Sequence, residues 1–221
     1  NRIRLLNSDN VTILALSHHM KALLASYGIR EEKIEVLPNG QTFSYVNLSE
    51  IPREKIVGYY GGQAEHKGYK VFYRLAEIVR AKVPDARFVA TGVFSTKSPN
   101  VDYVGLLDRI EVAKLMARSR VTVMPSIWDE PFPLVVIESL AVGTPVVAFD
   151  VGVLREIIRD GEGGFVVPLM DVNRMADRVV EILTDDELFR RLSENARRIA
   201  KDYTEDKRIK KLDSIIKRIL Q

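Results

Sequence analysis

The sequence has no cysteine, no long apolar run and almost no net charge. Without cysteine the chain forms neither disulfides nor thiolate metal sites, and this composition fits a reducing compartment. No apolar run reaches the roughly 18–20 residues that a membrane-spanning helix needs, and the polar start "NRIRLLNSDN" is unlike a signal peptide. A formal charge of +3 over 221 residues is too small and too evenly spread to indicate nucleic-acid binding. We therefore expect a cytoplasmic protein with no nucleic-acid partner.

The short motifs of common catalytic and metal sites are also absent. The chain has no Walker A loop, no GxGxxG, no HExxH and no DxD pair. Its three histidines are His18, His19 and His66, and the first two are sequence neighbours that point in different directions. Because no group of residues has metal-ligand spacing, we expect no metal ion and no bound cofactor.

The sequence does contain a regular alternation of strand-like and helix-like segments, and its 46% of apolar residues is enough for a packed core. Expected strands are 11–17, 33–38, 55–60, 86–92, 100–105, 120–126, 145–149 and 163–168. Helices are expected at 18–28, 134–142, 171–184, 185–202 and 205–220. Two more are expected: one has Phe72, Leu75, Ala76 and Val79 on one face, and the other is capped by Asp108. Alternation of this kind predicts an α/β fold with a doubly wound parallel sheet, which is Rossmann-like.

Two segments fall outside this alternation. Residues 41–54 lack a period and contain a proline, which is typical of a linker. The last helix is amphipathic, because Ile209, Leu212, Ile216 and Ile219 share one face among Lys and Arg residues. Such a helix usually docks onto its own domain, and the alternative is that it lies on an acidic membrane surface.

The stretch "GGQAEHKG" at 61–68 follows an expected strand. Gly61 and Gly62 let the backbone approach a ligand closely. Lys67 stands at the start of a helix, where free N–H groups and the helix dipole favour a phosphate. The alternative is an ordinary glycine-rich turn with a solvated lysine.

The stretch "WDEPFPLVVIES" places Glu130 in a stiff, proline-rich loop and Glu138 about one turn into the next helix. Burying an acid in such an apolar run is costly unless something holds it. Two acceptors with helix N–H groups between them match a nucleotide sugar, which has hydroxyls at both ends and a diphosphate in the middle. The alternative is that Glu138 pairs with a buried arginine and Glu130 is a first-turn acid.

The stretch "AVGTPVVAFDVG" supplies a tight helix-to-strand turn at Gly143 and Pro145, for which we expect a structural role. Gly152 follows the strand, with Glu156 shortly after it. Because Gly152 stands at the carboxyl end of a strand, where ligands bind in such sheets, a ligand role is open to it.

Taken together, these stretches and "VDYVGLLDRIEVAKLMARSRVTVMPS" between them resemble the C-terminal domain of GT-B glycosyltransferases, in particular family 4, over roughly 55–205. The order and spacing of the motifs, with the E-x7-E pair, carry the resemblance. It implies that residues 1–45 are the end of an N-terminal acceptor domain and the hinge. It implies that 46–204 are the nucleotide-sugar-binding domain and 205–221 the C-terminal amphipathic helix.

The resemblance also implies a retaining hexosyltransferase that uses a UDP- or GDP-hexose as donor substrate and needs no tightly bound metal. Its acceptor would be a sugar, a lipid or a glycan, and transfer would require the N-terminal domain that this chain largely lacks. Catalytic roles fall on Glu130, at the donor sugar, and on Lys67, at the phosphates. Donor-binding roles fall on Gly61, Gly62, Val104, Gly105, Phe132, Pro133, Leu134, Val135 and Glu138.

Two positions depart from the family pattern. Many members have an arginine where this chain has Gly62, and many have a glycine where it has Pro133, which offers no N–H. Arg155 is a candidate for the missing positive charge. The alternatives to a transferase are a non-catalytic nucleotide-sugar-binding module and a nucleotide-sugar epimerase of GT-B fold. Association with the inner face of a membrane is a further possibility, carried by the last helix.

Overall fold

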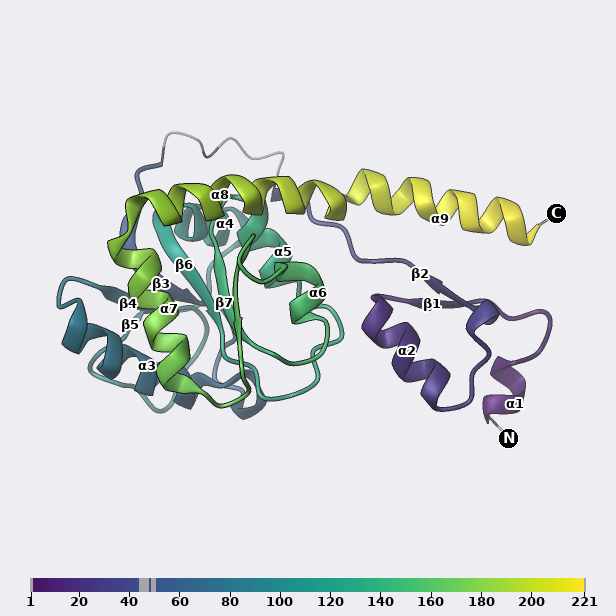
Figure 1. The fold of residues 1–221 in the computed structure, drawn as a ribbon, viewed down its shortest axis with the longest axis horizontal. Helices are drawn as coiled ribbons and strands as arrows, with labels where there is room; N and C mark the ends of the chain where they lie inside the picture. The colour runs from purple at the N-terminus through teal and green to yellow at the C-terminus, as the bar shows by residue number, and fades with distance from the viewer. Residues whose placement is uncertain (1, 44–47, 49–50, 221) are drawn as a thin grey trace.

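The protein folds around two parallel sheets. A computed structural model describes residues 2–43, 48 and 51–220. The larger sheet has six parallel strands in the order β5-β4-β3-β6-β7-β8. These strands are β3 (Glu54–Tyr59), β4 (Arg87–Ala90), β5 (Asp102–Tyr103), β6 (Ser119–Met124), β7 (Val146–Phe149) and β8 (Gly164–Val167). The doubly wound parallel sheet expected from the sequence is confirmed (Figure 1).

The strand order reverses between β3 and β6. From β3 the chain runs outward through β4 to β5, and from β6 it runs the other way through β7 to β8. In open sheets of this kind the connecting loops part at the reversal and leave a crevice beyond the carboxyl ends of the two central strands. The loops that follow β3 and β6 therefore border the expected ligand site.

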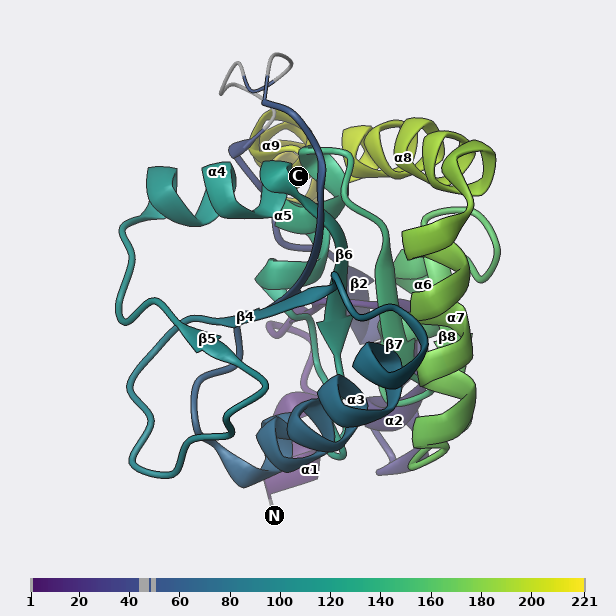
Figure 2. The same ribbon diagram turned by 90° about the vertical axis from the view of Figure 1, so that its left-hand side faces the viewer.

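Helices cover both faces of the larger sheet (Figure 2). One cluster of buried side chains joins the sheet to α3 (Tyr69–Lys82) and α7 (Val172–Thr184). On the other face, α5 (Leu134–Ala141), α6 (Leu154–Ile158) and α8 (Asp186–Ala200) pack against β6 to β8, and α4 (Arg109–Arg118) packs beside α5. We call this body, residues 51–203, the large sheet unit.

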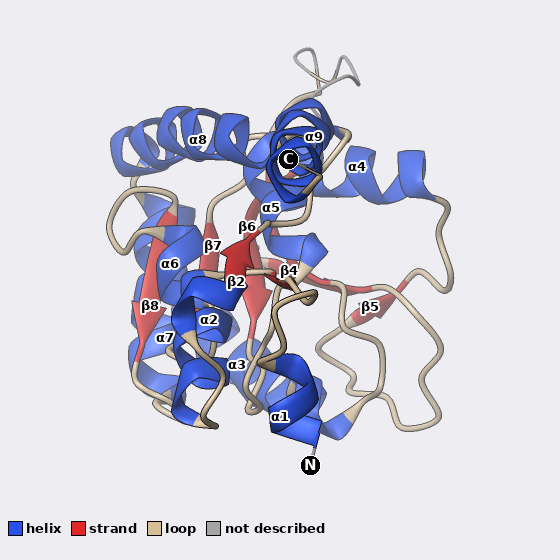
Figure 3. Cartoon of the chain, turned by 90° about the vertical axis from the view of Figure 1, so that its right-hand side faces the viewer, coloured by secondary structure: helices blue, strands red, loops and turns tan. Residues whose placement is uncertain are grey.

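Residues 2–36 form a second, smaller body, which we call the small sheet unit (Figure 3). Its parallel strands β1 (Ile13–Ala15) and β2 (Ile34–Val36) flank α2 (His18–Ser26), and α1 (Arg2–Leu6) and the short 3-10 turn η1 (Glu31–Lys33) complete it. Two segments connect the units. Residues 37–43 run beside the end of α8, where the Gln41 N–H donates to the Tyr203 carbonyl at 2.7 Å. Helix α9 (Glu205–Ile219) then extends alongside the small sheet unit, where Arg218 pairs with Glu35 (Figure 1).

Local sequence signals account well for the helices of the large sheet unit. The predicted face of α3 is confirmed, since Phe72, Leu75, Ala76 and Val79 are all fully buried. Asp108 caps α4 as predicted, in a reciprocal capping box with Glu111. Helices 171–184, 185–202 and 205–220 appear as α7, α8 and α9. Residues 44–47 and 49–50 of the predicted linker lie outside the described residues.

On α4 the buried residues are Ala113, Met116 and Ala117. One buried face differs from prediction. On α9 the only buried residue is Ile215, at 4% exposure. Of the predicted stripe, Leu212 is half-buried, whereas Ile209, Ile216 and Ile219 are exposed. Most of the stripe therefore does not pack on the described residues. No described helix is long and apolar enough to cross a membrane.

One glycine fixes the approach of α3 to the sheet. Gly68 has φ +78°, and a Cβ at this position would lie 1.9 Å from the Pro125 carbonyl oxygen in the loop after β6. We predict that Gly68→Ala lowers the free energy of unfolding by more than about 3 kcal/mol, because backbone strain of roughly 1–3 kcal/mol adds to the clash. Denaturant unfolding measures this loss.

Gly161→Ala is the matched control. Gly161 has nearly the same φ, +81°, but no atom lies within 4 Å of the place that its Cβ would occupy. It should therefore report the backbone strain alone, roughly 1–2 kcal/mol. Equal losses for the two variants would contradict the close approach of Gly68 to Pro125.

Candidate functional site

The candidate site is built around an ion pair between Lys67 and Glu130, the two residues with predicted catalytic roles. Lys67 ends the 3-10 turn η3 (Glu65–Lys67) after β3, and Glu130 lies in the loop after β6. The Lys67 Nζ lies 2.7 Å from Oε1 and 2.9 Å from Oε2 of Glu130. The pair therefore lies at the reversal of strand order, where the topology places a ligand.

Glu130 is buried as well as paired. The residue is 1% exposed, and the Lys67 side chain is 27% exposed, so the lysine lies between the carboxylate and solvent. The hydroxyl of Ser126 donates to Glu130 Oε1 at 2.5 Å and lies 3.0 Å from the His66 carbonyl oxygen. The carboxylate thus has one cation and one hydroxyl as partners, which is the support that a buried charge requires.

The main chain of Glu130 is fixed by the loop after β7. The Val153 N–H donates to the Glu130 carbonyl at 3.1 Å. Gly152 has φ +54°, and a Cβ there would lie 2.3 Å from the carbonyl oxygen of Glu130 and 2.5 Å from its nitrogen. The role of Gly152 in this structure is thus to let the two loops touch.

The predicted glycine loop lies beside Lys67. The Tyr59 hydroxyl donates to the Gly62 carbonyl at 2.9 Å, and burial, with a smaller contribution from Glu130, raises the pKa of Tyr59 so that it keeps its proton. Gly62 has φ +62° and no atom within 4 Å of where a Cβ would stand. An arginine is therefore disfavoured here by backbone strain, not by lack of space.

The start of α5 follows the Glu130 loop directly. Phe132 is buried against Tyr203, with ring centroids 5.7 Å apart, so its side chain supports the loop from the core. Pro133 is the N-cap residue and makes no side-chain cap. By helix geometry the N–H groups of Leu134 and Val135 have no acceptor within the helix. These two N–H groups are the donors that this helix start can offer an anion.

Glu138 lies inside α5 and pairs with an arginine from α4. Its Oε1 lies 3.3 Å from Arg109 Nη2, and its side chain is 13% exposed while that of Arg109 is 56% exposed. Burial raises the pKa of Glu138, and the opposing effect of Arg109 does not cancel it. The alternative of pairing with an arginine is realised, but the arginine is exposed and leaves the acid undercompensated.

Val104 and Gly105 lie after β5, at the same carboxyl edge of the sheet. Val104 is exposed, and Gly105 has φ +73° with no atom within 4 Å of a Cβ position. The Gly105 carbonyl accepts from the Gly92 N–H at 2.7 Å, which joins this loop to the one after β4. Arg155, the candidate for a missing positive charge, instead pairs with Asp150.

The structure thus brings Lys67 and Glu130 into contact and leaves Glu138 paired separately. Sequence reasoning missed Ser126 and Arg109, which hold the two acids. It also missed the contact of His19 with Asp129, at 2.8 Å. Arg109 directly follows the helix cap Asp108, but nothing in the sequence pairs it with Glu138.

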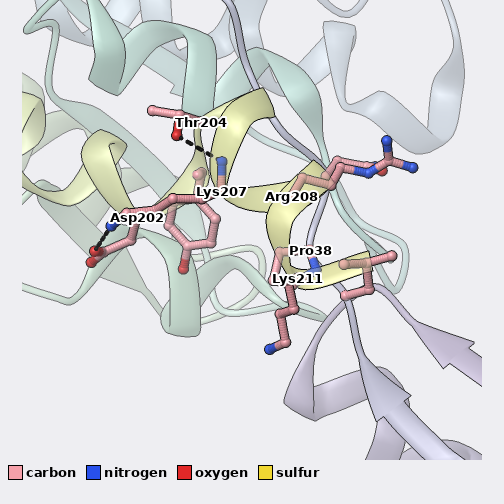
Figure 4. Close-up of a pocket in the computed structure, with 9 residues that line it drawn as sticks. Pro38, Asp202, Thr204, Lys207, Arg208 and Lys211 are labelled. Atoms are coloured by element: carbon pink, nitrogen blue, oxygen red, sulfur yellow. Dashed lines mark hydrogen bonds and ion pairs between the residues drawn. The ribbon is translucent and has the colours of Figure 1, made fainter. Parts of the chain in front are cut away.

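Two further observations limit the chemistry. Within the described residues, no group of three or more His, Asp or Glu side chains could hold a metal ion. A cavity of about 300 Å³ lies at the joint of the two units, away from these loops (Figure 4). Pro38 lines it together with Lys207, Arg208 and Lys211 of α9, and it includes none of the predicted site residues.

A family model described as "Glycosyl transferases group 1" matches residues 46–199. The chain is 28% identical over 194 residues to an uncharacterized 41.2 kDa protein in the cps region of Klebsiella pneumoniae, which covers 81% of this chain and 53% of that protein. It is 31% identical over 154 residues to the alpha-D-kanosaminyltransferase of Streptomyces kanamyceticus, which covers 64% of this chain and 39% of that protein. The chain thus spans about half the length of these relatives, or less.

Solved structures of glycosyltransferases have a similar fold. A glycosyltransferase from Rickettsia africae superposes with a TM-score of 0.85 at 20% identity, over 99% of this chain and 67% of that one. Anabaena Alr3699/HepE, solved in complex with UDP and glucose, superposes with a TM-score of 0.84 at 20% identity, over 98% of this chain and 65% of that one. At this identity the likeness shows the fold, which is of the GT-B type.

The ion pair makes a testable contribution to stability. We predict that Lys67→Met lowers the free energy of unfolding by roughly 2–4 kcal/mol, because it leaves Glu130 buried without a cation. Adding Glu130→Gln should recover most of that loss, and a double-mutant cycle in denaturant measures the coupling. Additive losses from the two substitutions would show that the side chains do not interact in solution.

Glu138, in contrast to the ion pair, should lower the stability of the folded state. Its raised pKa means that the folded state disfavours the ionised form, a penalty that is absent below the ordinary pKa of glutamate, about 4.3, and grows as pH rises through the raised pKa. We predict that Glu138→Gln raises the melting temperature at pH 7 and that this gain shrinks towards pH 4.

Glu181→Gln is the control. Like Glu138, Glu181 pairs with an arginine, in this case Arg178, but its side chain is half exposed on α7. It should change the melting temperature little at either pH. A lower melting temperature for Glu138→Gln at pH 7, or a gain that does not depend on pH, would contradict the buried and undercompensated charge.

Proposed function

Since the chain belongs to the group 1 glycosyltransferases, whose family model covers more than two thirds of it, we propose that it is the donor-binding part of a retaining, family 4 hexosyltransferase. The proposed donor is a UDP- or GDP-hexose, and the acceptor is a sugar, lipid or glycan bound with the help of a preceding acceptor domain. In this proposal residues 1–45 end that domain, 46–204 bind the donor, and 205–221 are the C-terminal helix. A cytoplasmic setting belongs to the proposal because the chain has no cysteine.

The observation that carries the proposal is the ion pair of Lys67 and Glu130 at the reversal of strand order. A lysine, a carboxylate and a helix start meet there, and a sugar diphosphate needs all three: a cation and N–H groups for its phosphates and an acceptor for its hydroxyls. On binding, the diphosphate takes the Lys67 ammonium, and Glu130 turns to a hydroxyl of the transferred sugar. The pair therefore exchanges its internal partners for those of the donor.

The other site residues have matching roles. Glu138 accepts from the ribose hydroxyls, and the N–H groups of Leu134 and Val135 face the diphosphate. Gly61 and Gly62 let the main chain approach the donor, and Val104 and Gly105 flank the base. Phe132 and Pro133 shape the loop between the two acids.

In the reaction the bond between the sugar C1 and the phosphate oxygen breaks, and the acceptor oxygen bonds to C1 on the same face. The proton of the acceptor hydroxyl passes to the departing phosphate oxygen. The negative charge of transfer collects on the departing diphosphate. Lys67 stabilises this charge from a fixed position, which is how a preorganised cation lowers a barrier. No protein nucleophile is assigned.

A non-catalytic nucleotide-sugar-binding module is the second candidate. Gly62 supplies no charge, Pro133 supplies no N–H, and Asp150 neutralises Arg155, so the phosphates meet few positive groups among the described residues. This candidate predicts donor binding without transfer.

Calorimetric titration with a panel of UDP- and GDP-hexoses tests donor binding in the full-length protein. We predict that one donor class binds and that Glu138→Gln weakens it roughly 10- to 100-fold, the range expected for a hydrogen bond to a charged group. Glu181→Gln should bind as the unchanged protein does. Absence of heat with every nucleotide sugar would refute the proposal.

Transfer is tested separately with Glu130→Gln. This isosteric change should abolish turnover while donor still binds. Only a carboxylate can exchange its contact with Lys67 for a full-strength hydrogen bond from the sugar hydroxyl. Near-normal turnover would refute the role of Glu130. Donor binding without turnover in the unchanged protein, over a panel of acceptors, would favour the non-catalytic module.

A further inference from the structure

The first turn of α2 in the small sheet unit contacts the loop that contains Glu130 and helix α6. His19 Nε2 lies 2.8 Å from Oδ1 of Asp129, the residue that directly precedes Glu130. The N–H groups of His18 and His19 donate to the Glu156 carboxylate at 3.1–3.3 Å. Glu156 belongs to α6, three residues after Val153, whose N–H holds the Glu130 carbonyl.

The Glu156 contact uses the strongest feature that α2 offers. Ser17 caps the helix by accepting from the Met20 N–H, which leaves the first two N–H groups of the helix without an internal acceptor. Glu156 takes both, and its negative charge meets the positive end of the helix dipole. The N-terminus of α2 in the small sheet unit is thus capped by an acid of the large sheet unit.

These contacts cross between two bodies that, among the described residues, residues 37–43 and α9 also join. Of the neighbouring apolar residues, Leu16 adds packing against the cluster that contains Phe132 and Val153. A rotation that separates the two units would break the bonds of His18, His19 and Glu156 together. The loop of Asp129 and Glu130 would then lose its support on the side of the small sheet unit.

We propose that Glu156 and His19 are positioning residues that set the main chain of Asp129 and Glu130 when the two units are closed on one another. Neither residue touches the donor; both act through Glu130. The inference rests on the proposed function for its consequence, since Glu130 must meet the donor sugar for its position to matter. The contact itself is independent of that function.

Steady-state kinetics of the full-length enzyme compare three variants. Glu156→Ala removes both acceptor oxygens, and Glu156→Gln keeps one. Glu162→Ala is the matched control, because Glu162 also forms an ion pair between separate elements, with Arg198 at 3.1 Å, but makes no contact with α2. Donor affinity is measured beside kcat by calorimetry.

The proposal predicts that Glu156→Ala lowers kcat roughly tenfold or more while donor affinity stays within about twofold. Glu156→Gln should recover a substantial part of kcat, and Glu162→Ala should leave it unchanged. Unchanged kcat in Glu156→Ala would overturn the proposal. So would a parallel loss of donor affinity, which would make Glu156 a donor-binding residue, or an equal loss in Glu162→Ala, which would indicate general destabilisation.

Hydrogen exchange gives a readout that needs no substrate. The amides of His18 and His19 should exchange slowly in the unchanged protein and in Glu162→Ala, and at least roughly tenfold faster in Glu156→Ala. Equal exchange in all three would overturn the contact itself. If no nucleotide sugar binds but the amides are protected by Glu156, the proposed function fails and the contact between the units stands.

Discussion

The site depends on one buried charge and its single cation. Glu130 is almost completely enclosed, so its carboxylate is stable only because Lys67 and Ser126 are both within hydrogen-bond reach. The lysine comes from the loop after β3 and the acid from the loop after β6, so the pair joins the two central strands where their connections diverge. Gly68, Gly152 and Val153 fix the backbone on either side. The loops of the site are therefore arranged around this interaction.

The two acids of the loop and helix are held in different ways. Glu130 has a close cation and a hydroxyl, whereas Glu138 has only an exposed arginine, and burial raises its pKa. An undercompensated acid inside α5 reduces the stability of the unliganded fold, and such costs concentrate where a ligand is to supply the missing partner. Two ribose hydroxyls would give Glu138 the donors that the protein withholds. The buried Glu138 carboxylate is thus the origin both of the stability penalty and of the proposed recognition of the ribose.

Sequence patterns were sufficient to predict those features of the fold that depend on interactions between residues close in sequence. The period of Phe72, Leu75, Ala76 and Val79, the cap at Asp108 and the alternation of strands and helices predict the elements and the parallel sheet. They were insufficient for contacts between distant residues, such as Arg109 with Glu138, 29 residues apart, and His19 with Asp129, 110 apart. The short α6 shows no full period, and the packing of α9 through Ile215 depends on the path of the chain between the units. Residue spacing does not encode any of these.

A crystal structure of the full-length protein with its UDP- or GDP-hexose tests the central claim most directly. The account predicts that the Lys67 Nζ leaves Glu130 and lies about 2.7–2.9 Å from a phosphate oxygen, with Glu130 on a sugar hydroxyl and Glu138 on the ribose. A donor bound elsewhere, with the ion pair of Lys67 and Glu130 intact, would contradict it.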